Sequence, residues 1–268
     1  MKFHHPPAVS DHVYGLPRDL AFPVGSTVDI PAGLAREIHD FWEVKRLLDP
    51  NIFDGELLSA TRMWVTPSGS TEVSLRQTRF SHYLFGQANP LPPSQMCRSV
   101  AVNAVPHTSD GFFVLARMGT MSSFRGRIKF IGGAASIDDI RDGAFQPRLC
   151  LGREFREEVG LDLSTIAHAP EPPHLSTRPG FNIFNLSYRL ELKLDKQALL
   201  ASANFSTDDK TGGQGEVSEL VFLEATDVGL AGFEQEFGSQ CLDYVIPYLR
   251  VVLGQSPVRS LQAEMFNG

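Results

Sequence analysis

The segment from Arg153 to Leu161 reads REFREEVGL, and it is the most informative part of the chain about its fold. On a helix that turns about 100° per residue, Glu154, Glu157 and Glu158 share one face, because the first lies three and four residues before the others. Apolar residues of the same segment fill the neighbouring stripe. The spacing therefore predicts a helix that buries one edge and holds an acidic edge at a cleft.

The acidic face suits a divalent cation. Carboxylates at this spacing repel one another by a few tenths of a kcal/mol per pair, and a bound cation would remove that repulsion. All the ligands would be hard oxygens, which favours Mg²⁺, with Mn²⁺ as a substitute, over zinc or copper. Arg153 lies four residues before Glu157 and can hold that side chain in position. Runs of Glu and Arg are more often a solvated helix face, so the neighbouring sequence has to decide.

The neighbouring sequence carries a resemblance to a known family. Residues Arg153 to Leu161 match, at every position, the core of the Nudix signature G-x5-E-x7-R-E-U-x-E-E-x-G-U, where U is a bulky aliphatic or aromatic residue. The pair Gly132-Gly133 follows an expected strand over 128–131, where the signature has its glycines. The chain thus resembles the Nudix hydrolases. A glycine lets the backbone approach a metal or phosphate closely, and the resemblance implies that the Gly133 carbonyl is a metal ligand.

The spacing upstream departs from the signature. Gly133 lies twenty residues before Arg153, about six more than usual. Counting forward from Gly133 places Asp139 at the first acidic position, whereas counting backward from Arg153 places Phe145 there. We favour Asp139, with the insertion after it. Ile131 stands where a proline commonly precedes the two glycines.

The resemblance implies an enzyme in which water attacks a phosphorus of a diphosphate. Glu157 and Glu158 are the expected direct metal ligands, and Glu154 is either a third ligand or the group that activates water. Arg153 is expected to assist them. Another base is expected at Glu216 or Glu219, and Glu216 is favoured because it follows a Gly-rich loop that can move. The alternative for both is ordinary surface charge.

The order of patterns predicts an α+β protein, because strands and a few helices do not alternate strictly. The resemblance implies a Nudix-type α/β/α sandwich with a mixed sheet. We expect an N-terminal α/β extension over 1–96, a catalytic domain over 97–257 and a tail over 258–268. The proline-rich stretch 87–94 is the expected linker.

Periodicity and turn residues predict the individual elements. The first 33 residues, rich in Pro and Gly, are expected to wrap over the surface. The extension is expected to hold a helix over 34–48 and a hairpin over 55–79. The later elements are a hairpin over 99–116, a strand over 128–131, a helix over 147–159, strands over 181–194 and 218–223, and a helix over 233–253 that is kinked or split at Pro247.

Composition excludes some classes of partner. The 268-residue chain has a formal net charge of −7, so it offers no overall basic field for long nucleic acid. Cys97, Cys150 and Cys241 are odd in number and widely spaced, which indicates a reducing cytoplasm rather than a disulfide framework or zinc site. The first residues contain no apolar stretch of the kind found in signal peptides, and no apolar run reaches about 18 residues, so neither a signal peptide nor a membrane span is expected.

The sequence does not identify the substrate, and it is compatible with two functions. The expected substrate is a small nucleotide-like diphosphate, such as a nucleotide sugar or ADP-ribose. Segments 53–55 and 78–83 are similar to the extension of the UDP-glucose diphosphatase branch. The rival is a Nudix-shaped sensor that binds such a ligand without turnover, and the intact acidic trio favours the enzyme. The sequence does not determine the oligomeric state; many relatives pair as dimers, and the first 96 residues could provide the contact of a homodimer.

Overall fold

The structure is a computed structural model that places most of the chain. It describes residues 12–17, 20–50, 52–65, 70–119, 122, 124–177, 183–205 and 216–259. The Gly-rich loop over 208–215 and most of the expected tail lie outside these ranges.

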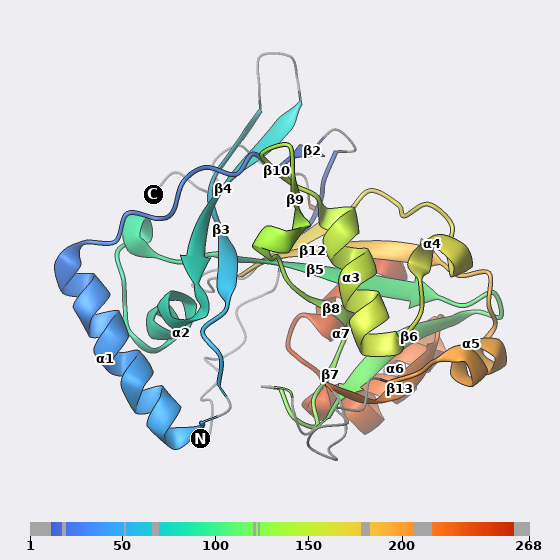
Figure 1. The fold of residues 1–268 in the computed structure, drawn as a ribbon. Helices are drawn as coiled ribbons and strands as arrows, with labels where there is room; N and C mark the ends of the chain where they lie inside the picture. The colour runs from blue at the N-terminus through green and yellow to red at the C-terminus, as the bar shows by residue number, and fades with distance from the viewer. Residues whose placement is uncertain are drawn as a thin grey trace.

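One mixed sheet of eleven strands runs through the described chain (Figure 1). Its main path is β1-β11-β12-β5-β3-β4-β2, with β6, β7, β8 and β13 branching from it. β12 (Ile183–Glu191) pairs in parallel with β5 (Ser99–His107), whereas β3 (Glu56–Val65) pairs antiparallel with β4 (Thr71–Arg79). The other strands are β1 (His12–Gly15), β2 (Leu20–Ala21), β6 (Phe112–Met118), β7 (Ile128–Lys129), β8 (Ile131–Ala134), β11 (His174–Thr177) and β13 (Val217–Glu224).

Helices cover both faces of the sheet. In Figure 1, α3 (Pro147–Val159) crosses one face, and α6 (Asp227–Phe237) with α7 (Val245–Val252) lies on the other. Successive residues of β6 divide between two cores: Val114 packs in the same cluster as Phe155 of α3, and Leu115 packs with Leu249 of α7. This alternation is what a strand buried on both faces requires. The predicted α+β fold, an α/β/α sandwich with a mixed sheet, is confirmed.

The N-terminal extension adds two helices beside the same sheet. Leu34 and Ile38 of α1 (Ala32–Leu48) pack against Phe85 of α2 (Phe80–Ala88). The predicted helix and hairpin of this region are confirmed, but α2 was not foreseen, and it takes the first residues of the expected linker. β3 pairs with β5, which begins just after the expected linker, through Ser59 and Ser99. The boundary at 96 and 97 stays a prediction.

The helix α3 follows its sequence signals closely. It spans the predicted range, with Pro147 at its first position, where a missing backbone N–H costs nothing. Gly160 ends it in the left-handed region at φ 77°, and the Gly160 N–H bonds to the carbonyl of Arg156 at 2.9 Å. These two residues set where the helix begins and ends.

Three expectations need correction. The strand over 128–131 is interrupted at the buried Phe130, because β7 pairs with β6 and β8 with β5, so the two glycines lie inside β8 rather than after a strand. The last helix breaks between Phe237 and Val245, not at Pro247, which lies in the first turn of α7 and needs no helical N–H partner there. Part of the first 33 residues forms β1 and β2, because their backbones complete sheet edges.

All three cysteines are buried and form no disulfide bond. Within the described part of the chain, no helix is both long and apolar enough to cross a bilayer. The short elements are η1 (Pro93–Gln95), η2 (Ile137–Asp139), β9 (Ile140–Arg141), β10 (Ala144–Phe145), α4 (Leu163–Ile166), α5 (Lys196–Ser202) and η3 (Gly238–Gln240).

The packing of α3 gives a stability prediction. Phe155 is 0% exposed, so Phe155→Ala should lower the free energy of unfolding by about 3–5 kcal/mol, because it leaves a cavity between α3 and the sheet. Urea unfolding measures this. Leu47→Ala, at a residue 83% exposed on α1, is the control and should change stability by less than about 0.5 kcal/mol. A similar small effect for Phe155→Ala would contradict the packing described.

Candidate active site

The acidic face of α3 lies against the backbone of β8. Glu154 is 8% exposed and Glu158 3% exposed, whereas the side chain of Glu157 is 57% exposed. A Cβ atom added at Gly133 would lie 2.3 Å from Oε2 of Glu154, closer than atoms can approach. The glycine is therefore needed for this carboxylate to pack where it does. Two glutamates of the predicted trio are buried, and the third stands at the surface beside them.

Gly132 serves a different carboxylate. Its φ is 144°, and an added Cβ would lie 2.1 Å from the carbonyl oxygen of Val102 on β5. No other residue could occupy this position without moving the strand. The Gly132 N–H donates to Oε2 of Glu158 at 2.9 Å. The glycine pair thus lets β8 approach both buried glutamates.

Arg153 gathers three carboxylates. It contacts both oxygens of Asp139, from Nε at 3.2 Å and from Nη2 at 2.9 Å. Its Nη1 donates to Glu154 at 2.7 Å and to Glu157 at 3.1 Å. The hydrogen bonds to Asp139 are the main reason why the pKa of Arg153 is raised. This guanidinium therefore stays charged and fixes the orientation of the acidic face.

The inserted residues form a compact hairpin. β9 and β10 pair across a turn at Asp142 and Gly143, both with positive φ, as a tight two-residue turn requires. The hairpin leaves the buried Asp139 beside Arg153. Asp139 is the residue that we favoured for the first acidic position of the signature. Phe145, the other candidate, is 1% exposed in the apolar core and contributes no charge.

Lys129 also belongs to the site, although the sequence did not lead us to predict it there. Its ammonium donates to Oε1 of Glu158 at 2.8 Å and to the carbonyl oxygen of Gly132. The residue is only 7% exposed. One sequence signal was available: a lysine within the apolar run Ile128 to Ile131 needs a buried partner, because lysine is almost never buried unpaired.

Burial governs the protonation of the two inner glutamates. Desolvation raises the pKa of Glu154 to about 7, although the positive charge of Arg153 opposes the shift. Desolvation also raises the pKa of Glu158, and here the opposing charge is that of Lys129. Both carboxylates would be stabilised in their ionised form by further positive charge.

The structure separates the two candidates for an additional base. Glu219 forms an ion pair with Arg117 at 2.5 Å, which holds its carboxylate on the strand β13. Glu216 is exposed just before β13, and its negative charge contributes to raising the pKa of Glu158. Glu216 is therefore the candidate that the fold brings to the site.

The residues fit a divalent cation by donor type and by charge. Four carboxylates face two cationic side chains, which leaves two negative charges uncompensated when all are ionised. Among the described residues, no three acidic, histidine or cysteine side chains already converge on one point, so a cation would have to draw the carboxylates together. The four acids are Asp139, Glu154, Glu157 and Glu158, and the two cations are Lys129 and Arg153.

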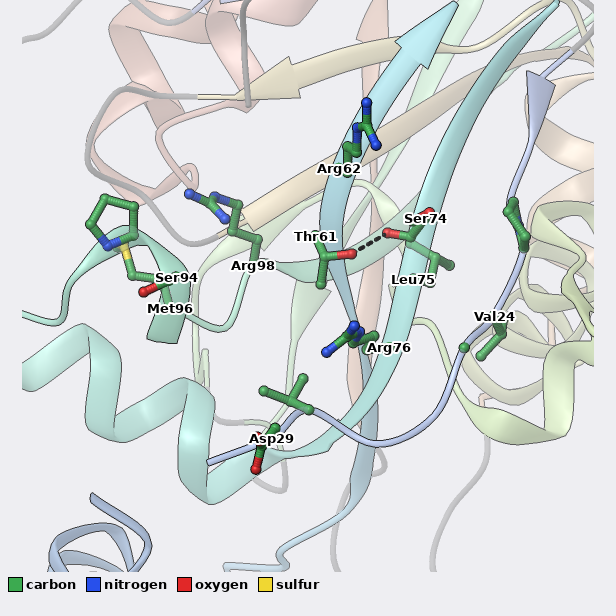
Figure 2. A pocket seen from close by; sticks show the side chains of 14 residues that line it. Val24, Asp29, Thr61, Arg62, Ser74, Leu75, Arg76, Ser94, Met96 and Arg98 are labelled. Atoms are coloured by element: carbon green, nitrogen blue, oxygen red, sulfur yellow. Dashed lines mark hydrogen bonds between the residues drawn. The ribbon is translucent and has the colours of Figure 1, made fainter. Parts of the chain in front are cut away.

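A separate hollow of about 570 Å³ lies on the extension. Figure 2 shows Arg62, Arg76 and Arg98 around it, and the dashed line marks the 3.1 Å hydrogen bond from the Thr61 hydroxyl to the Ser74 carbonyl. Its walls come from β3, β4 and the segments 23–29 and 93–98. No residue of α3 lines it, so it is not the acidic site.

Comparisons with known proteins give distant structural likenesses only. No protein-family model and no curated protein matches the sequence. A protein from Deinococcus radiodurans is similar at a TM-score of 0.43 and 16% identity, covering 73% of this chain and 98% of that one. A MutT protein from Methanosarcina mazei Go1 is similar at 0.38 and 15%, covering 59% and 93%.

A bifunctional NMN adenylyltransferase/ADP ribose pyrophosphatase from Francisella tularensis, complexed with AMP and a Mn ion, is similar at 0.43 and 10%. The likeness covers 65% of this chain and 45% of that one. TM-scores below 0.5 do not establish a shared fold, so the function of this chain is inferred from the residues of its own site.

The contact between β8 and Glu154 can be tested with glycine variants. Gly133→Ala should destabilise the protein by about 1–3 kcal/mol, because its Cβ would overlap the Glu154 carboxylate. Gly152→Ala in α3 is the matched control: its Cβ meets nothing within 4 Å, and alanine is the better helix former by about 1 kcal/mol. Chemical unfolding of both variants measures the difference. Equal stabilities would refute the close approach.

The raised pKa of Glu154 predicts how stability depends on pH. Its pKa is about 7 in the folded protein against an ordinary value of 4.5 for a glutamate, so the folded state binds the proton more tightly. Without metal, stability should therefore fall as pH rises from about 4.5 to about 7, by about 3 kcal/mol from this residue.

Glu154→Gln has no such proton to lose, so its stability should decline less over the same range. Urea unfolding in the presence of a chelator, from pH 4.5 to pH 8, measures both curves. Parallel curves for the variant and the parent protein would show that Glu154 titrates normally.

Proposed function

We propose that this chain is a Nudix-type hydrolase that cleaves the diphosphate linkage between a nucleoside diphosphate and another moiety, with Mg²⁺ or Mn²⁺. The observation that supports it most directly is the burial of Glu154 and Glu158 against the two glycines of β8, with Glu157 exposed beside them. A merely solvated helix face would not bury two of its three carboxylates. The signature match and the tertiary contacts thus select the same residues.

The cation-holding groups implied by the resemblance are Gly133, Glu154, Glu157 and Glu158. Glu154 and Glu157 both pair with the single positive charge of Arg153, so their two negative charges are only partly neutralised. When bound, a divalent cation would supply positive charge that offsets the negative charge developing on the diphosphate oxygens as the bond breaks. The desolvation that raises the pKa of Glu154 also strengthens its attraction to such a charge.

The remaining groups orient the site and move a proton. Arg153, anchored by Asp139, holds Glu154 and Glu157 in place before substrate arrives. We assign Glu216 as the group that accepts the proton of the attacking water, because it is exposed, its charge acts on Glu158, and it is not among the three glutamates of α3. Glu154 is the alternative base, since a carboxyl with a pKa near 7 also suits that role.

A substrate panel separates an enzyme from a sensor. ADP-ribose, UDP-glucose, NADH, coenzyme A, diadenosine polyphosphates and capped RNA should be incubated with the protein and either Mg²⁺ or Mn²⁺. We expect turnover of a small nucleoside diphosphate derivative, such as a nucleotide sugar or ADP-ribose. Tight binding of one compound, with no product from any, would instead favour a ligand sensor of the same fold.

The role of Glu157 gives the test of the mechanism. Glu157→Gln should lower metal-dependent turnover at least about 100-fold, because it removes a negatively charged oxygen ligand from the cation. Its side chain is 57% exposed, so the fold should be retained. Steady-state kinetics with thermal unfolding measures both effects. Glu236→Gln, at an exposed glutamate of α6, is the control and should leave the rate unchanged. Near-normal turnover by Glu157→Gln would refute the ligand assignment.

A further inference from the structure

The buried ammonium of Lys129 already serves one part of the acidic site. It donates to Oε1 of Glu158 at 2.8 Å and to the carbonyl oxygen of Gly132. The other oxygen of Glu158 accepts the Gly132 N–H at 2.9 Å. Both carboxylate oxygens and the neighbouring carbonyl therefore have partners inside the protein. Glu158 is 3% exposed, and the Lys129 side chain is 9% exposed.

The partners of Lys129 are the kind of group that a hard cation takes. Carboxylate and backbone carbonyl oxygens are preferred ligands of Mg²⁺ and Mn²⁺. A lysine ammonium is also a compact positive charge with several donors, and it satisfies the same oxygens. Removing two charges from water costs several kcal/mol per ion, so this pair persists only because both ends are well bonded.

We propose that Lys129 is a built-in cation that takes the place of a metal ion at Glu158 and the Gly132 carbonyl, and confines the divalent cation to Glu154 and Glu157. This inference rests on the proposed function and changes its ligand set. Glu158 and Lys129 are then positioning residues that hold α3 against β8. They are not catalytic residues.

The charge balance agrees with this division. The pair of Lys129 and Glu158 is neutral by itself. Among the described residues, the carboxylates of Asp139, Glu154 and Glu157 form ion pairs with the single charge of Arg153, which leaves two negative charges in this group when all are ionised. That excess equals the charge of one divalent ion. With the pair of Lys129 and Glu158 closed to metal, the proposal predicts a single bound Mn²⁺ or Mg²⁺ in the absence of substrate.

Calorimetric titration with Mn²⁺ alone tests the division, using the metal-free full chain. The parent protein should bind one Mn²⁺, and Glu157→Gln should bind it at least about 10-fold more weakly. Glu158→Gln should change the affinity by less than about 3-fold. An affinity loss in Glu158→Gln as large as that in Glu157→Gln would overturn the proposal.

Because Glu158→Gln leaves a buried ammonium unpaired and could unfold, a double variant keeps the test decisive. Lys129→Met with Glu158→Leu replaces the pair by apolar side chains, a change that is often tolerated. It should keep the fold, judged by circular dichroism, and bind one Mn²⁺ with an affinity within about 3-fold of the parent protein. Loss of Mn²⁺ binding by the folded double variant would overturn the proposal.

Lys129→Met alone asks whether the lysine excludes metal. It frees Glu158 and the Gly132 carbonyl, so the variant should bind a second Mn²⁺, seen as a doubled stoichiometry. An unchanged stoichiometry would count against the exclusion. Failure of the parent protein to bind Mn²⁺ at all would contradict the proposed function as well. Loss in the Glu158 variants alone contradicts only the role of Lys129.

Discussion

The contact between the acidic face of α3 and the glycine backbone of β8 is the constraint on which the site depends. Atoms of Glu154 occupy the space that a side chain at Gly133 would need. Gly132 needs a positive φ and lies against the backbone of β5. A larger residue at Gly132 would have to move the backbone of β5, whereas one at Gly133 would displace the Glu154 carboxylate. The helix, the strand and the glutamates can therefore only be assembled together.

Burying these carboxylates has an electrostatic cost, which shapes the rest of the site. Lys129 neutralises Glu158 from within the sheet, and Arg153 ties Asp139, Glu154 and Glu157 from the helix. The inserted hairpin of β9 and β10 keeps Asp139 within reach of Arg153. Two negative charges of these four carboxylates remain uncompensated by the two cationic side chains, so the site is suited to a divalent cation and to the anionic diphosphate that such a cation would attract.

Strong local signals predicted the elements that carry the site. Pro147 and Gly160 marked the ends of α3, and alternating apolar residues marked the hairpin of β3 and β4. Elements without such signals were missed. β1 and β11 are short and pair with each other across a long separation in sequence. The end of α6 likewise depends on packing, because the proline taken as a break lies harmlessly in the first turn of α7.

Residue identity and spacing were enough to put three glutamates on one helical face, because helical geometry is a local property of the backbone. The same spacing could not say which of them is buried or what neutralises it. Lys129 and Glu158 are distant in the chain, and their pairing exists only once β7, β8 and α3 are packed. Spacing likewise could not show that Asp139 pairs with Arg153 while Phe145 fills the core, because both contacts depend on tertiary packing.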